Sequence, residues 1–178
     1  MHPFSSWLAK MLHEHKSDVD RLLNDQTALH FLITWSLFES KCFSGFLRAK
    51  CLRAFSDSVI EEGLSTMDLG RQLEHFHTRY RDEKKLGNLL HDDKTPTAVV
   101  DEFKRCLTVE MSNLSARDRI FTVVFVIYRF RNNMFHGNKR VESWLRFREE
   151  IGLCTEAMQV FVAHSEKLRP SMQIAAAA

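Results

Sequence analysis

Apolar residues recur along most of the chain every three or four positions, which is the period of an α-helix with one buried face. Long runs of Val, Ile and Thr, which are typical of strands, are few. Glycine and proline are also scarce, with 6 and 3 residues, whereas a many-stranded sandwich or barrel needs frequent turn residues. The pattern therefore predicts an all-α protein.

Polar and turn-forming residues interrupt the helical period at several places. Gly63 lies in a polar stretch at 56–65, where we expect a turn, and a second stretch at 86–96 has the composition of a surface loop. Gly45 is expected only to loosen the longest helix. The predicted helices cover, in chain order, residues 18–23, 27–55, 67–85, 98–110, 116–135 and 142–168.

The length and composition suit a single domain. A chain of 178 residues with 44% apolar content can bury a core without a disulfide or a structural metal. We assign residues 1–170 to one helical domain and residues 171–178 to a C-terminal tail. The alanine run at 175–178 suggests a cloning remnant, so the tail is left out of the functional argument.

Neither the cysteines nor the histidines form a recognisable metal-binding pattern. His13 and His15, like His75 and His77, are two residues apart, and such side chains point in different directions on a helix. We therefore expect no metal site and no cofactor. The cysteines contain no C-x-x-C pair, and we expect reduced, mostly buried thiols at Cys42, Cys51, Cys106 and Cys154.

The most apolar segment, residues 120–128, is bounded by arginines and is far shorter than the roughly 20 residues that span a bilayer. It is predicted to be a core helix, with no membrane contact. The first residues also lack the basic region and long apolar stretch of a secretory signal. We therefore expect a cytoplasmic location.

Charge is unevenly distributed along the chain, although the net charge is only +2. Residues 117–148 contain eight basic and two acidic residues, a net of +6, and the remainder has a net of −4. A basic sector of this kind is typical of a phosphate-binding surface. Solvated arginines beside two buried helices would give the same count, so both interpretations stay open.

Polar residues with catalytic potential crowd the end of the apolar helix at 116–135. Asn132 and His136 are four residues apart and share a helix face, and Asn133 lies beside them. Arg131 points about 140° away from His136 on an ideal helix. Their convergence would need the long arginine side chain, a distortion of the last turn at Gly137, or a second subunit.

An arginine and a histidine together could cleave RNA without a metal. The arginine can bind a phosphate through two donors, and the histidine titrates near neutrality and can act as acid or base. Two simpler roles compete with this one. His136 could cap the helix C-terminus, where a cation is favoured, and Arg131 could form an exposed salt bridge.

The segment from Arg131 to Gly137 resembles the R-x4-6-H motif of the HEPN superfamily. Arg131 and His136 match the motif's invariant pair, and Asn132 matches the polar residue after the arginine. The segment 35–41 also looks like the family's early core helix, in which Glu39 could be the acidic residue that some members supply. The resemblance implies an all-α, HEPN-like bundle of about five to seven helices that forms a homodimer.

The resemblance also implies a function and partners. Many members are ribonucleases of toxin–antitoxin, abortive-infection or other anti-phage systems, so RNA is the expected substrate and an antitoxin or regulatory protein an expected partner. His136 would be the acid or base, Arg131 the phosphate clamp and Asn132 the orienting amide, with Asn133 in support. Candidates for contacts with the RNA backbone are Arg129, Lys139 and Arg140.

One departure from the family is visible. Toxins of the subgroup that is silenced by nucleotidylation continue the motif as H-x-Y, whereas this chain has His136-Gly137-Asn138. That mode of silencing is therefore not supported. Two other classes of function stay open: a catalytically silent HEPN-like module that binds nucleotide, RNA or protein, and a plain helical scaffold subunit.

Overall fold

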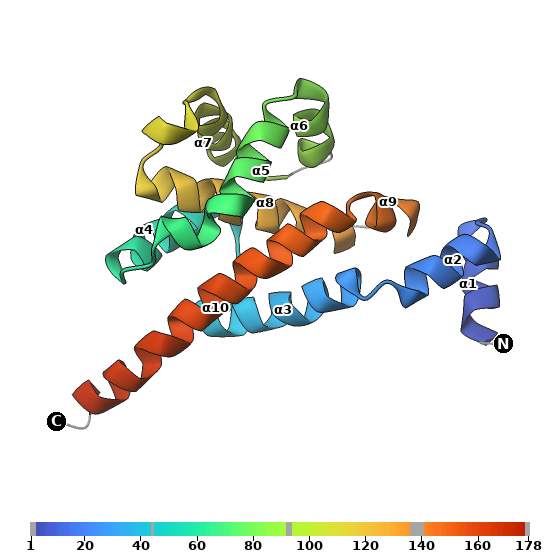
Figure 1. The fold of residues 1–178 in the computed structure, drawn as a ribbon, viewed down its shortest axis with the longest axis horizontal. Coiled ribbons are helices and arrows are strands. Elements are labelled where there is room, and N and C mark those ends of the chain that lie inside the picture. The colour runs from blue at the N-terminus through green and yellow to red at the C-terminus, as the bar shows by residue number, and fades with distance from the viewer. Residues whose placement is uncertain (1–2, 44, 92–93, 136–140, 177–178) are drawn as a thin grey trace.

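The computed structural model describes residues 3–43, 45–91, 94–135 and 141–176 (Figure 1). Within these ranges the protein is all-α, with ten α-helices, three short 3-10 helices and no strand. The α-helices are α1 Pro3–Leu12, α2 Lys16–Asn24, α3 Thr27–Cys42, α4 Leu52–Glu61, α5 Gly70–Tyr80, α6 Glu83–Leu90, α7 Thr97–Thr108, α8 Ala116–Phe135, α9 Val141–Arg146 and α10 Arg148–Ala176. The 3-10 helices are η1 Ala49–Cys51, η2 Thr66–Leu69 and η3 Met111–Asn113.

Helix α8 forms the centre of the core. Every side chain from residue 120 to residue 127 is buried, and α4, α5, α6, α7 and α10 all pack against the helix. Phe125 of α8 stacks on Phe103 of α7, with 4.1 Å between ring centroids. A helix that is apolar on all sides has to be enclosed in this way, so the prediction of a core helix at 116–135 is confirmed.

No helix in the described ranges has both the length and the apolar character that a membrane span requires.

Helices α3 and α10 form a long pair beneath the group of helices around α8 (Figure 1). Phe38 of α3 connects the two parts, because its ring lies 5.6 Å from that of Phe161 on α10 and 5.7 Å from that of Phe55 on α4. Helices α1 and α2 extend from the far end of α3, where the main neighbour of α1 is α2.

The prediction of a single helix at 27–55 is wrong in its second half, where the helix is interrupted. Helix α3 ends at Cys42, and Gly45 has a φ of 133°, which a helix does not contain. The carboxylate of Glu39 accepts a hydrogen bond from the Leu47 backbone N–H at 2.9 Å and holds the loop in place. The chain then re-enters helix as α4, so most of the turn expected at 56–65 is helical up to Glu61.

The boundaries around α5 and α6 also differ from those expected. The helix predicted at 67–85 is divided, because Asp82 caps a new helix by accepting a hydrogen bond from the Lys85 N–H at 2.9 Å. Helix α6 therefore occupies the first part of the loop predicted at 86–96. Such a cap is strong enough to start a helix despite the glycine at position 87 within it.

The two chain ends are more helical than expected. Helix α1 was not predicted, and the helix predicted at 142–168 is divided into α9 and α10. Helix α10 continues through Pro170 to Ala176, because good helix formers, including two of the terminal alanines, follow the proline. The described ranges thus contain more helices than the five to seven expected.

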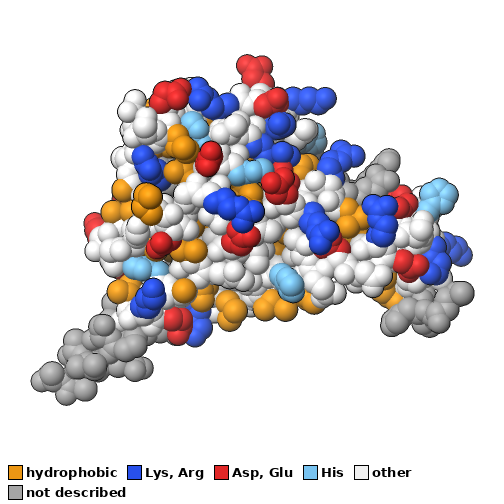
Figure 2. All heavy atoms as spheres, viewed as in Figure 1, with side chains coloured by type: hydrophobic (Ala, Val, Ile, Leu, Met, Phe, Trp, Pro, Cys, Tyr) orange, Lys and Arg blue, Asp and Glu red, His pale blue; other side chains and the backbone are white. Residues whose placement is uncertain are grey.

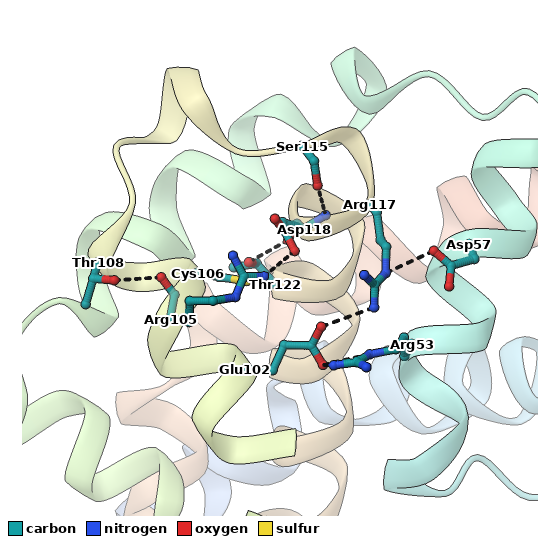
Figure 3. Close-up of polar contacts among 10 residues, drawn as sticks. All are labelled: Arg53, Asp57, Glu102, Arg105, Cys106, Thr108, Ser115, Arg117, Asp118 and Thr122. Atoms are coloured by element: carbon teal, nitrogen blue, oxygen red, sulfur yellow. Dashed lines mark hydrogen bonds and ion pairs between the residues drawn. The ribbon is translucent and has the colours of Figure 1, made fainter. Parts of the chain in front are cut away.

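A network of ion pairs joins α4, α7 and the start of α8 (Figure 3). Glu102 of α7 lies at its centre, with a side chain only 8% exposed, and accepts hydrogen bonds from Arg53 of α4 and Arg117 of α8. Arg117 also pairs with Asp57 at 2.9 Å. Because Glu102 is buried, the two arginines offset the cost of removing its carboxylate from water.

A further ion pair joins α7 to the start of α8. Arg105 of α7 donates a hydrogen bond to Asp118 in the first turn of α8. Partial burial raises the pKa of Asp118. Hydrogen bonds from Arg105 and Ser115 lower it by more than burial raises it, so the pKa lies below the ordinary aspartate value. Asp118 therefore stays ionised and stabilises the positive end of the α8 dipole.

Replacement of Glu102 by glutamine should destabilise the protein by about 1–3 kcal/mol, because two arginines lose their buried counter-charge. Glu110→Gln is the matched control, since Glu110 forms an exposed pair with Arg81, and it should change stability by less than about 0.5 kcal/mol. Urea unfolding of the three proteins measures both effects. Equal stability of the two variants would contradict a central role for Glu102.

Candidate functional site

The last turns of α8 carry two arginines with different surroundings. Arg129 and Arg131 are two residues apart, so they point in different directions from the helix axis. Arg129 is 1% exposed and is among the largest fully buried side chains in the protein. Arg131 is partly exposed. The two therefore require separate interpretations.

Arg129 and Asn133 bind the end of α6. The Arg129 guanidinium donates two hydrogen bonds to the Leu89 carbonyl, at 3.1 and 2.8 Å, and one to the His91 carbonyl at 3.4 Å. Asn133 donates to the same Leu89 carbonyl at 3.1 Å and accepts from Arg129 at 3.2 Å. The last carbonyls of a helix have no partner within it, and these side chains supply one.

These contacts correct the prediction for Arg129 and give Asn133 a structural role. Arg129 cannot contact an RNA backbone from a buried position at the end of α6, so its assignment as a backbone contact is wrong for this structure. Asn133 is directed to Arg129 and Leu89. Its predicted support of the site involves His136, which lies outside the described residues. Both residues instead fix the position of the helix end from which Arg131 and Asn132 project.

The basic sector predicted at 117–148 is also less available to phosphates than its charge suggests. Arg117 pairs with Asp57 and Glu102. Arg119 donates to the carbonyls of Leu114 and Met111, both at 3.0 Å. Arg148 pairs with Asp25 at 3.1 Å. With Arg129, four of the eight basic residues have partners within the protein, and the interpretation as arginines flanking buried helices fits these four.

Arg131 lies against α3. Its guanidinium carbon is 5.6 Å from the centroid of the Trp35 ring, within the range of a cation–π interaction. Its Nη1 donates a hydrogen bond to the Asn132 side-chain oxygen at 3.2 Å. The structure therefore brings together two of the three residues that match the motif, and it adds Trp35, which the sequence predicts only as part of a core helix.

Glu39, the acidic residue expected from an earlier helix, lies one turn beyond Trp35 on α3. Residues four apart share a helix face, so Glu39 and Trp35 lie on the same side of α3. One carboxylate oxygen of Glu39 accepts the Leu47 N–H. Glu39 therefore has a structural role in the loop after α3.

Three of the predicted site residues, His136, Lys139 and Arg140, lie outside the described residues. The geometry of the candidate site thus consists of Arg131 and Asn132, at the end of α8, and of Trp35, on which Arg131 stacks.

The cysteines are free thiols. Cys106 and Cys154 are buried, whereas Cys42 and Cys51 are half-buried, so the expectation of mostly buried thiols is only half fulfilled. Burial raises the pKa of Cys106 to about 11 and that of Cys154 well above its usual value. Neither of these two thiols is a nucleophile at neutral pH.

The two histidines of α5 point to different partners, as their spacing predicts. One ring nitrogen of His77 lies 2.9 Å from the Val109 carbonyl, which makes this buried residue part of the core. His75 faces Glu149 and Glu150 at the start of α10. The cluster of His75, Glu149 and Glu150 cannot be predicted from local sequence, because its members are far apart along the chain.

Comparisons with protein-family models, with characterised proteins and with solved structures found no match to the chain.

Substitution of Arg129 and of Arg131 should change the free energy of unfolding by different amounts. Arg129→Met should lower the free energy of unfolding by about 2–4 kcal/mol, because charge-assisted hydrogen bonds to the end of α6 are lost from a buried site. Arg131→Met should cost less than about 1 kcal/mol, the worth of a partly exposed cation–π contact. Thermal and urea unfolding measure both; an equal cost for both variants would contradict the division of roles.

Proposed function

We propose that the protein is a metal-independent endoribonuclease of the HEPN type, with Arg131, Asn132 and His136 as its catalytic residues. The observation that carries the proposal is the pairing of Arg131 with Asn132 at the end of a buried helix, five residues before His136. The all-α architecture is compatible with it.

The surroundings of Arg131 suit a phosphate clamp. Trp35 contacts the guanidinium through the ring face, whereas a phosphate binds guanidinium N–H groups in the plane of their fork. The aromatic contact and the bond to Asn132 restrict the side chain before substrate binds. A positioned cation of this kind stabilises the negative charge that develops on phosphorus oxygens in the transition state.

The proposed reaction uses the RNA's own 2′-hydroxyl as the nucleophile. A base removes the proton of the 2′-hydroxyl, the 2′-oxygen forms a bond to the adjacent phosphorus, and the bond from phosphorus to the 5′-oxygen breaks. An acid then protonates the leaving 5′-oxygen. His136 supplies this acid–base chemistry, and the products are a 2′,3′-cyclic phosphate and a 5′-hydroxyl. DNA, which lacks the 2′-hydroxyl, is not a substrate.

The proposed enzyme acts as a homodimer, and an exposed face of α3 supports this. Leu29, Ile33 and Leu37 are 49%, 53% and 45% exposed and follow one another every four residues, so they form a stripe on the helix. Apolar side chains gather along this edge of the molecule (Figure 2). The segment between Gln26 and Glu39 contains no Asp, Glu, Lys or Arg. A regular apolar stripe of this kind is typical of a protein–protein interface.

A homodimer would also allow Arg131 and His136 to act at one site although they point in different directions from the helix. An ideal helix directs the two side chains about 140° apart, and a cleft shared by two subunits lets residues from both contribute to one site. In the cell, the proposed role is that of a toxin or phage-defence effector, and an antitoxin or another regulatory protein would then control it.

The direct test is cleavage of mixed cellular RNA in EDTA, with analysis of the product ends. The wild type should produce cyclic-phosphate ends, and Arg131→Ala and His136→Ala should each lower the rate by at least 10²-fold, with both variants folded. Arg48→Ala is the matched control, because it removes an exposed arginine from another part of the chain.

Cleavage that required a divalent cation, or that survived in both variants, would contradict the proposed mechanism. If the wild type were inactive but bound RNA or nucleotide through Arg131, the chain would instead be the catalytically silent module considered above. Calorimetry with the wild type and Arg131→Ala distinguishes that case.

The dimer has a test of its own. Ile33→Glu places a charge at the centre of the α3 stripe and should convert a dimer to a monomer in light scattering after gel filtration. Thr78→Glu adds the same charge at an exposed position on α5 and should leave the dimer intact. A wild-type monomer at micromolar concentration would contradict the dimer without deciding whether the chain cleaves RNA.

A further inference from the structure

A histidine and two carboxylates meet where α5 crosses the start of α10. His75 of α5 has one ring nitrogen 3.8 Å from a Glu149 oxygen and the other 3.7 Å from a Glu150 oxygen. One ligand atom from each residue can be chosen so that all three atoms lie within 4.8 Å of one another. It is the one group of this kind found in the described ranges.

We infer that His75, Glu149 and Glu150 form a binding site for Zn²⁺. The distances from His75 to the carboxylates are too long for good hydrogen bonds, and among the described residues the buried Nε2 atom has no hydrogen-bond partner. Zn²⁺ holds nitrogen and oxygen ligands at about 2.0–2.2 Å, which places tetrahedral ligands about 3.4 Å apart. The two carboxylates face different ring nitrogens of His75, and only one nitrogen can hold the ion, so the three ligand atoms, which lie within 4.8 Å of one another, would have to approach by up to about 1.4 Å.

The burial of Glu150 supports the inference. Its side chain is 3% exposed, whereas that of Glu149 is 68% exposed, so the site has one ligand inside the protein and one at the surface. Three protein ligands leave the fourth position of a tetrahedral ion for water from the Glu149 side. The ion could enter and leave from that side without unfolding of the core.

Arg79 completes the surroundings of the site. Its Nη1 lies 2.7 Å from Glu150, and its guanidinium lies over the Phe147 ring at 6.0 Å. A carboxylate has about four lone-pair positions, so Glu150 can bind the ion and keep Arg79, which then orients the ligand from outside. The arginine charge repels the ion, however, and should reduce its affinity.

The ligand types distinguish between possible cations. Mg²⁺ and Ca²⁺ prefer oxygen ligands only, whereas Zn²⁺ and Co²⁺ accept imidazole nitrogen together with carboxylate oxygen. A bound ion would join α5 to the first turn of α10, and its expected effect is on stability. The site contains neither Arg131 nor Asn132, so the inference does not depend on the proposed nuclease activity.

The test uses the full chain, free of any histidine tag and treated with chelator, and titrates it with Zn²⁺ in a calorimeter. One ion should bind per chain, and a Zn²⁺ concentration 100 times the dissociation constant should raise the melting temperature by about 5–10 °C. Co²⁺ should give the visible absorption of a four-coordinate ion, and Mg²⁺ should give neither effect.

Variants of the ligands decide whether the ion binds at this site. His75→Ala and Glu149→Gln should each weaken Zn²⁺ binding at least tenfold, and the exposed Glu149 can be changed without loss of fold. Arg79→Met should strengthen binding, because it removes the competing charge but keeps an apolar side chain beside Phe147. Glu156→Gln, which removes the partner of Arg71 in another α5–α10 ion pair, should bind as the wild type does.

Zinc binding that is absent, or equal in the wild type and in Glu149→Gln, would overturn the inference and leave the group as an ion-pair cluster. Equal stabilisation by Mg²⁺ would overturn it as well. A tenfold loss confined to the two ligand variants would establish the site, whatever the result of the RNA cleavage assay.

Discussion

The enclosure of α8 is the constraint on which the rest of the structure depends. Its side chains from 120 to 127 are buried in every direction, so neighbours have to cover the helix all round. Helices α4, α5, α6, α7 and α10 do so. Helix α3, which pairs with α10, lies beneath them. Polar groups that enter this core at either end of α8 must bring their own partners, as Glu102 does at one end and Arg129 at the other.

The arginines of α8 show why charge counted along a chain is a poor guide to a binding surface. Four arginines in the basic sector, Arg117, Arg119, Arg129 and Arg148, are held by carboxylates or by backbone carbonyls. Arg131 differs in that it contacts the Trp35 ring and the side-chain amide of Asn132. Of the arginines in α8, Arg131 is the one to which the proposed mechanism gives a catalytic role.

The sequence predicted some elements well for physical reasons. Helix α8 has a capping serine and a continuous apolar segment, and α7 has a clear helical period, so both were located closely. The division of α3 from α4 was missed because it requires a positive φ at Gly45 and a bond from Glu39 to a residue eight positions later. Helical period alone gives no information on either.

The candidate site was predicted only in part. The pairing of Arg131 with Asn132 follows from their adjacency, but the stacking on Trp35 depends on how α3 packs against α8. The roles of Arg129 and Asn133 likewise required the position of α6. The meeting of His75 with Glu149 and Glu150 could not be seen in any local pattern, because only the crossing of α5 and α10 creates it.

The bond of Arg129 and Asn133 to Leu89 also affects how long the candidate site keeps its shape. Helix ends ordinarily fray, since their last residues open at little cost in free energy. Arg131 and Asn132 lie between two residues that are both attached to α6, so their turn cannot open without breaking those contacts as well. Local opening of the site is thereby coupled to separation of α6 from α8. The lifetime of the Arg131 geometry is then set by the packing of two helices.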